Sequence, residues 1–278
     1  MPKISVIMGV YREKKEYLQE AILSILKQTW TDLELLVYLD GDQPELKKVV
    51  KEMSRKDKRI HILEEKKNYG LGHGLNVCIA EASGEYLARM DSDDLSEPDR
   101  LEHQVRFLEQ HPDCDFVGCN TLLFDNHGVY GSRKMKTEPE KEDFYDYLPF
   151  VHPSVIFRAE IFSDGIRYPE SKETLRSEDL VLFMELYARG KKGRNLQEYL
   201  YRYREDANAF EKKKYRYRLI ESRVRREGYD QLQLQGAKSW LYTVKPLVVG
   251  LIPAPLMFVI KRQRDVKEIR HGTTYGSL

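Results

Sequence analysis

The chain carries an acidic cluster, Asp91-Ser92-Asp93-Asp94, directly after an apolar run that is typical of a buried strand. Two carboxylates at positions i and i+2 of a loop can both face one hard cation, such as Mg²⁺ or Mn²⁺, together with the oxygens of its ligand. A nucleoside diphosphate that acts as a leaving group needs such a cation, because negative charge builds up on it as its bond breaks. The carboxylates could instead cap the helix that Glu97-Pro98 opens, and for Asp94 both interpretations have equal weight. Because Asp-x-Asp is common, its position after a strand is what favours a metal site.

Other polar positions could take part in chemistry, and each has a plain structural alternative. Asp40 ends a strand beside Gly41, so its carboxylate could accept a hydrogen bond from a base or a ribose, and a simple turn is equally favoured. Glu178 and Asp179 begin a helix, and one of them could act as a general base, although acidic residues are also common in first helical turns. A lone histidine such as His152 is more often structural than catalytic.

The elements that must position these residues alternate between strands and helices along the first 110 residues. Apolar runs predict strands at 4–8, 33–39, 60–63 and 85–90, and helical spacing predicts helices at 13–28, 44–56, 75–82 and 98–110. A glycine-rich loop, 68–74, precedes the third helix. This alternation predicts an α/β fold with a mainly parallel nucleotide-binding sheet flanked by helices. In such sheets ligands bind beyond the carboxyl ends of the strands, where polar clusters fall at 9–13, 40–42 and 91–94.

Composition narrows the class of protein. Hydrophobic residues make up 41% and charged residues 33% of the 278 residues, which excludes a disordered chain. Cys78, Cys114 and Cys119 fit neither a disulfide framework nor a zinc site, so we expect buried, reduced thiols. The first residues lack the basic region and long apolar stretch of a signal peptide, so we expect a cytoplasmic protein.

Charge is unevenly spread, although the net charge is only +1. Residues 205–278 hold 15 Lys/Arg against 8 Asp/Glu, so the rest of the chain is acidic. Basic residues at 212–226 lie on an expected helix, a second helix is expected at 232–242, and an apolar stretch at 246–260 is broken by prolines. That stretch is too short to span a membrane. Its basic flanks favour an anionic membrane surface over a core-packing helix, and no nucleic-acid motif accompanies it.

The chain resembles the family 2 glycosyltransferases, which are inverting enzymes with an A-type nucleotide-sugar fold. The resemblance covers residues 3–205, where the matching segments occur in the order and spacing of the family. Within this family it is similar to capsule, exopolysaccharide and amylovoran-type transferases. The matching segments are Val6–Tyr11, Ala21–Thr29, Asp32–Asp42, Asn68–Leu71, Leu75-Asn76, Ala82–Asp94, Pro98–Glu102, His152–Ser154 and Ser177–Asp179.

The resemblance implies the transfer of a sugar from a nucleotide sugar, a UDP-sugar for preference, to a hydroxyl of a lipid-linked or glycan acceptor at the inner face of the plasma membrane. It implies Mn²⁺ or Mg²⁺ bound by Asp93 and Asp91, Asp179 as catalytic base, and acceptor binding by Glu178 and His152. The positions that it assigns to the nucleotide sugar are Val10, Tyr11, Arg12, Glu13, Asp40, Asn68, Gly70, Asn76, Arg89, Asp91 and Ser92. It implies a catalytic domain at 1–205, with a nucleotide-sugar half at about 1–95 and an acceptor half at about 96–205, and a helical basic extension at 206–278.

The sequence departs from the family pattern on the donor side. The family usually has Pro at the position of Gly9 and Asn at that of Arg12, and only Asp40 remains of its adjacent pair of aspartates. We interpret these changes as tuning of the donor pocket. Two alternatives stay open: a nucleotide-sugar-binding subunit without catalysis, and a nucleotidyltransferase, which 9–15 does not support because it lacks the expected glycine-rich basic signature.

Overall fold

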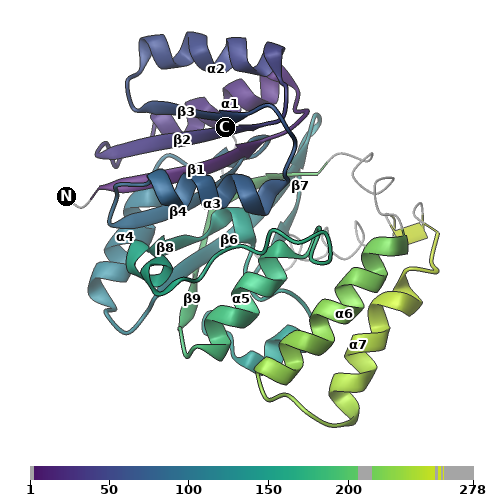
Figure 1. The fold of residues 1–278 in the computed structure, drawn as a ribbon. Helices are drawn as coiled ribbons and strands as arrows, with labels where there is room; N and C mark the ends of the chain where they lie inside the picture. The colour runs from purple at the N-terminus through teal and green to yellow at the C-terminus, as the bar shows by residue number, and fades with distance from the viewer. Residues whose placement is uncertain (1–2, 206–214, 254–255, 258, 260–278) are drawn as a thin grey trace.

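A mixed sheet at the centre of the molecule carries helices on both faces (Figure 1). The computed structural model describes residues 3–205, 215–253, 256–257 and 259. The strand order is β3-β2-β1-β4-β8-β6-β9-β5, and β7 pairs with β6. The predicted fold class, an α/β sheet flanked by helices with a helical C-terminal part, is confirmed.

The first half of the sheet is parallel, as predicted. Its strands are β1 (Ile4–Val10), β2 (Leu33–Asp40), β3 (Ile60–Glu65) and β4 (Tyr86–Asp91). Gly9 of β1 lies beside Asp91 of β4, and Val10 lies beside Leu39 of β2. The register therefore brings the polar ends of these strands to one edge, as expected for a parallel sheet.

The first four helices are α1 (Lys15–Leu26), α2 (Pro44–Lys56), α3 (Leu71–Glu81) and α4 (Arg100–Gln110). Helix α3 begins four residues before the predicted helix at 75–82. Gly74 lies against the ring of Tyr38, and Gly72 lies against the carbonyl oxygen of Pro169, so neither position has room for a Cβ. These glycines allow α3 to pack closely on its neighbours. The sequence analysis had instead assigned them to a loop at 68–74.

The second half of the sheet mixes directions. Its strands are β5 (Leu95–Ser96), β6 (Phe116–Asp125), β7 (Gly128–Arg133), β8 (Ile156–Arg158) and β9 (Gly193–Arg204). β8 is antiparallel to β4 and β6, β6 is antiparallel to β7, and β5 is antiparallel to β9. Only β6 and β9 pair in parallel here.

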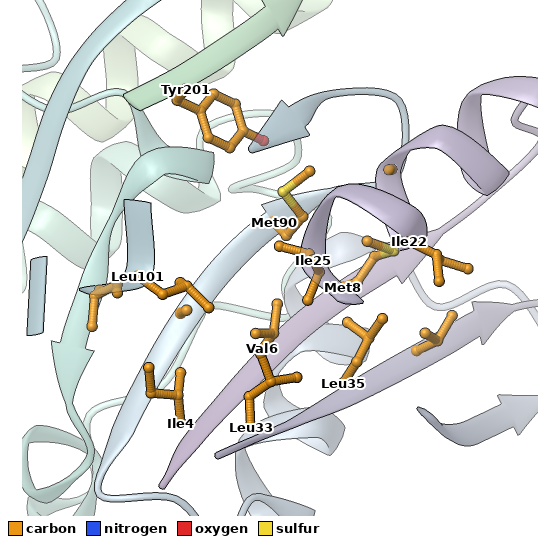
Figure 2. Close-up of a cluster of buried hydrophobic side chains, with 14 of the residues drawn as sticks. Ile4, Val6, Met8, Ile22, Ile25, Leu33, Leu35, Met90, Leu101 and Tyr201 are labelled. Atoms are coloured by element: carbon orange, nitrogen blue, oxygen red, sulfur yellow. The ribbon is translucent and has the colours of Figure 1, made fainter. Parts of the chain in front are cut away.

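Two apolar layers hold the helices to the sheet. On one face, α1, α2 and α4 share an apolar layer with Ile4, Val6 and Met8 of β1, and Figure 2 shows part of this layer. On the other face, α3 and α5 (Glu178–Ala188) pack on Ile7 and Leu36. Alternating side chains of a strand point to opposite faces, so β1 supplies both layers. The 3₁₀ helices are Lys141–Tyr145, His152–Ser154 and Ala159–Asp164.

The C-terminal helices are α6 (Tyr215–Gln231) and α7 (Ala237–Val249). Helix α6 packs on α5: Val224 and Tyr229 belong to the same apolar layer as α5, and Gly228 lies against the sulfur of Met184. Helix α7 starts at residue 237, so the helix predicted at 232–242 is displaced, because Gly236 has a φ of 97° that ends the preceding turn. Residues 212–214 of the predicted basic helix lie outside the described residues, and so does most of 254–260 of the predicted apolar stretch. Within the described part of the chain, no helix has the length and apolar character needed to cross a bilayer.

Candidate active site

A cavity of about 1560 Å³ opens at the carboxyl ends of β1, β2 and β4. Its wall brings together residues from Gly9 to Glu221, which lie 212 positions apart in the sequence. The predicted site residues that line it are Val10, Tyr11, Arg12, Asp40, Asn68, Gly70, Arg89, Asp91, His152, Glu178 and Asp179. The predicted residues that do not line it are Glu13, Asn76, Ser92 and Asp93.

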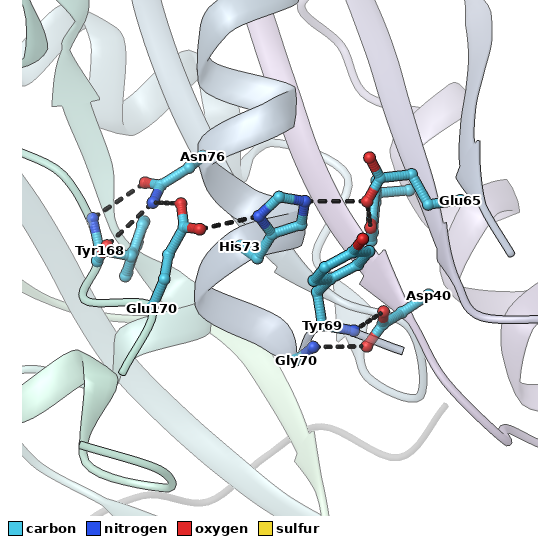
Figure 3. A network of polar contacts seen from close by, with 9 residues as sticks. Asp40, Glu65, Tyr69, Gly70, His73, Asn76, Tyr168 and Glu170 are labelled. Carbon is cyan, nitrogen blue, oxygen red and sulfur yellow. Dashed lines mark hydrogen bonds and ion pairs between the residues drawn. The ribbon is translucent and has the colours of Figure 1, made fainter. Parts of the chain in front are cut away.

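Asp40 holds the loop at the start of α3. Its carboxylate accepts hydrogen bonds from the Tyr69 amide at 2.8 Å and from the Gly70 amide at 3.0 Å (Figure 3). It also accepts one from Asn68 Nδ2 at 2.6 Å. The neighbouring Gly41 turns the chain with a φ of 79°. Asp40 is therefore a structural residue of this wall, and its contact with a base or ribose stays a prediction.

Two of the departures from the family pattern, Gly9 and Arg12, line the cavity. Gly9 faces Leu71, whose Cδ1 would lie 2.8 Å from a Cβ at position 9. Arg12 has a φ of 54°, a left-handed conformation that asparagine adopts more readily than arginine. The exposed side chain of Arg12 thus stands beside the cavity on a strained backbone.

Asn76 does not line the cavity and instead fixes the chain segment around Tyr168. It accepts a hydrogen bond from the Tyr168 amide at 2.9 Å and donates to the Tyr168 carbonyl at 2.8 Å (Figure 3). The Tyr168 hydroxyl in turn lies 2.7 Å from His152 Nε2. Burial, together with the charge of Arg89, holds the pKa of His152 well below its usual value, so this ring is neutral. Asn76 therefore acts on the site through Tyr168 and His152.

His73 joins the two halves of the molecule beside this network. Its Nε2 lies 2.9 Å from Glu65 and its Nδ1 lies 2.8 Å from Glu170 (Figure 3). Burial opposes the charged ring, but hydrogen bonds and charge from Glu170 and Glu65 outweigh it and raise the pKa of His73. The protonated ring can donate to both carboxylates.

We expect His73→Gln to destabilise the protein more at low pH than at high pH. The pKa of His73 is higher in the folded protein than in the unfolded chain. Its contribution to the free energy of unfolding is therefore fully present below the unfolded pKa and is lost as pH rises through the folded pKa. The measurement is the free energy of unfolding of both proteins at about pH 6 and about pH 9. A difference that stays constant or grows with pH would contradict the protonated bridge.

The acidic cluster has the geometry of a cation site. Carboxylate oxygens of Asp91, Asp93 and Asp94 lie within 4.8 Å of one another. Burial, followed by the charges of Asp91 and Glu13, raises the pKa of Asp93 to about 7. Glu13 is thus close enough to the cluster to act on it electrostatically. Hard oxygen ligands crowded together in this way fit Mg²⁺ or Mn²⁺.

Two residues of β9 hold the cluster in place, and sequence reasoning missed both. The Tyr201 hydroxyl donates to Asp94 at 2.9 Å, and the Arg204 amide donates to Asp94 at 2.7 Å. Arg204 Nε also donates to the Asp93 carbonyl at 2.6 Å. Helix α4 has Asp99 at its N-cap, so the capping alternative for Asp94 is wrong. Asp94 instead ties the acidic loop to β9.

Arg89 places a buried positive charge on the cavity floor. It is 1% exposed and donates from Nη2 to Asp91 at 2.6 Å. Its Nε and Nη1 have no hydrogen-bond partner among the described residues. Buried donors are rarely left unpaired, so these two nitrogens are exceptions in the described structure.

Asp179, the predicted base, stands at the start of α5 on the opposite wall. Burial raises its pKa to about 6, and a hydrogen bond from the Leu180 amide and the charge of Arg89 limit the rise. Burial also raises the pKa of Glu178, against hydrogen bonds from the backbone and the charge of Arg176. A carboxylate with a pKa near the operating pH is suited to general base catalysis.

Comparison with known proteins gives one consistent result. The family model described as glycosyl transferase family 2 matches residues 5–165. The glycosyltransferase EpsE of Bacillus subtilis (strain 168) is 36% identical over 268 residues, which cover 96% of both chains. The amylovoran biosynthesis glycosyltransferase AmsE of Erwinia amylovora is 27% identical over 268 residues, covering 94% of this chain and 98% of AmsE.

Solved structures agree with this chain in fold. S. aureus TarS in complex with UDP matches with a TM-score of 0.65 at 23% identity, over 90% of this chain and 70% of that chain. The mannosyltransferase PcManGT from Pyrobaculum calidifontis, in complex with GDP-Man and Mn²⁺, matches with a TM-score of 0.62 at 16% identity, over 94% and 79% of the two chains.

Proposed function

Because this chain belongs to glycosyltransferase family 2, we propose that it is an inverting, metal-dependent enzyme that transfers a sugar from a nucleotide diphosphate sugar to a hydroxyl acceptor. The observation that carries the proposal is the single cavity that joins Asp91 and Arg89 on the donor side to Asp179 on the acceptor side. The sequence likeness to AmsE, an amylovoran biosynthesis glycosyltransferase, supports a role in polysaccharide synthesis. For this role we propose a lipid-linked oligosaccharide as acceptor and a UDP-sugar as donor, and TarS, which has a similar fold, binds UDP.

The residues of the cavity divide the reaction between them. The walls around Val10, Asp40 and Asn68 would receive the nucleotide. Asp91 and Asp93 would hold Mg²⁺ or Mn²⁺, which neutralises charge on the diphosphate as the glycosidic bond breaks. Arg89 adds a fixed positive charge close to Asp91. Asp179 takes the proton from the acceptor hydroxyl as that oxygen attacks the anomeric carbon from the opposite side, which inverts its configuration.

Thermal unfolding with a panel of nucleotide sugars tests this proposal. A ligand that binds only the folded protein raises Tm by mass action. We expect one nucleotide class among UDP-, GDP-, dTDP- and CMP-sugars to raise Tm, and the increase to require Mn²⁺ or Mg²⁺. The absence of any shift in a folded protein would contradict the donor site. A donor shift without any transfer in lysate-derived lipid extracts would favour a binding subunit without catalysis.

We further propose that the enzyme works at the cytoplasmic face of the plasma membrane through α7. The outer face of α7 exposes large apolar side chains: Trp240 is 69%, Leu241 58% and Val248 59% exposed, and Leu251, in the turn after the helix, is 74% exposed. At helical spacing Trp240, Leu241 and Val248 form one stripe, and Lys238 and Lys245 lie along its edge. The opposite side of the helix is used internally, since Ser239 bonds Tyr145 and Pro246 is buried. An apolar stripe beside lysines suits the interface of an anionic membrane.

Replacing Trp240 and Leu241 together with serine is expected to lower the affinity for vesicles containing phosphatidylglycerol by at least about tenfold, because burial of such side chains contributes about 1.5–3 kcal/mol each. Co-sedimentation with the vesicles measures it. The matched control is Leu23→Ser, which removes an exposed leucine of α1. Equal binding of the double variant and the control would contradict the membrane role of α7.

A further inference from the structure

Two arginines converge on one tyrosine ring in the acceptor part of the cavity. The guanidinium of Arg176 lies 4.9 Å and that of Arg216 lies 4.8 Å from the centre of the Tyr217 ring. Arg216 also donates from Nη2 to the Tyr217 hydroxyl at 2.8 Å. All three residues line the cavity.

Neither guanidinium forms an ion pair with a carboxylate among the residues that the structure describes, and this distinguishes them from their neighbours. On the same helix, Arg218 pairs with Glu221, Arg223 with Glu173 and Glu227, and Arg225 with Glu221. Guanidinium groups without an ion-pair partner that lie beside one cavity favour the binding of an anionic group, because they can donate charged hydrogen bonds to it.

The backbone at Arg176 adds an independent sign of function. Arg176 has a φ of 65°, an unfavourable left-handed conformation for a residue with a Cβ. It stands three residues before Asp179 at the entry to α5, and its charge lowers the pKa of Glu178. Such strain persists where the surrounding structure enforces it, and it is concentrated at functional sites.

The position of the pair associates it with the acceptor. Arg216 and Tyr217 belong to α6, which packs on α5 (Figure 1), the helix whose first turn holds Asp179. The diphosphate of the donor belongs with Asp91 and Arg89 on the sheet. We propose that the acceptor carries a phosphate or a carboxylate, and that Arg176 and Arg216 bind this anionic group and place the neighbouring hydroxyl at Asp179. This inference rests on the proposed function.

Binding of small anionic sugars in the absence of metal and donor tests the inference. The probes are glucose 6-phosphate, glucuronate and methyl glucoside, titrated calorimetrically with EDTA present. We expect at least one charged probe to bind at least about tenfold more tightly than methyl glucoside. The stronger of the two charged probes distinguishes a phosphate from a carboxylate. Equal affinities for all three would overturn the proposal.

Arg176→Gln and Arg216→Gln are expected to abolish the preference for the charged probe, and Arg176→Lys is expected to retain part of it. The matched control is Arg226→Gln, an exposed arginine of α6 that does not line the cavity. Loss of the preference in the control as well would overturn the assignment to this pair.

Thermal unfolding with the nucleotide sugars and Mn²⁺ is measured on the same variants. If the two variants lose nucleotide-sugar binding and keep the probe preference, the pair serves the donor and the inference fails, while the proposed function stands. If wild-type protein binds no nucleotide sugar and still prefers the charged probe, the anion site stands and the proposed function fails.

Discussion

Replacing Asp179 with asparagine is expected to lower kcat by about 10²–10⁴-fold, because the amide cannot accept the proton of the acceptor hydroxyl. The substitution keeps the shape of the side chain at the start of α5, so donor binding should remain unchanged. The measurements are kcat with a lipid-linked acceptor and the Tm shift caused by the nucleotide sugar. A variant with near-normal kcat would remove Asp179 from the mechanism.

The pH dependence of the wild-type enzyme gives a second view of the same residue. A base must be deprotonated to act, so kcat/KM should rise with pH and level off above the pKa of Asp179, which burial raises to about 6. Asp179→Asn should lose this rising limb. Glu178→Gln should keep the limb and raise the acceptor KM, since Glu178 is assigned to acceptor binding. A limb that persists in Asp179→Asn would indicate that another group is the base.

The parallel half of the fold could be predicted because each of its strands is a continuous apolar run that ends in polar residues. Burial on both faces requires such runs, and the prediction of β2 differs from the structure only by Asp40. The glycines at 72 and 74 misled the prediction of α3, since a glycine needed for close packing has the same sequence signature as one needed for a turn.

The second half of the sheet, which mixes parallel and antiparallel pairs, was not predicted because its strand pairing depends on contacts between residues far apart in the sequence. Strand β9 has tyrosine at every second position from 199 to 203, a period of two that indicates a strand but not its neighbours. Its partner β6 lies about 80 positions earlier in the chain. The same long-range contacts decide the role of Asp94, whose partners Tyr201 and Arg204 are 107 and 110 residues away. Local sequence could identify the acidic cluster, and only tertiary structure could show which carboxylate is used for support.

Asp93→Asn is expected to change stability in opposite directions with and without metal. Because the folded pKa of Asp93 is raised, the folded protein binds the extra proton at low pH, and it loses stability as pH rises through about 7. At about pH 8 in EDTA, the neutral amide removes this cost, so the variant should melt at or above the wild-type Tm. The cause is the crowding of Asp93 with Asp91 and Glu13 in a buried position.

Addition of Mn²⁺ should reverse that order. A cation at about a hundredfold excess over its Kd stabilises the folded state by about 2.7 kcal/mol, which corresponds to about 5–10 °C in Tm for a chain of this size. Wild-type protein should show this increase in Tm on addition of Mn²⁺, and Asp93→Asn should not. The sugar transfer activity of Asp93→Asn should also fall below that of the wild-type enzyme. Asp32→Asn is the matched control, since Asp32 is exposed at the opposite edge of the sheet, before β2. If Asp93→Asn kept the full Mn²⁺ shift, the metal would have to bind elsewhere, and the acidic loop would act only through its charge.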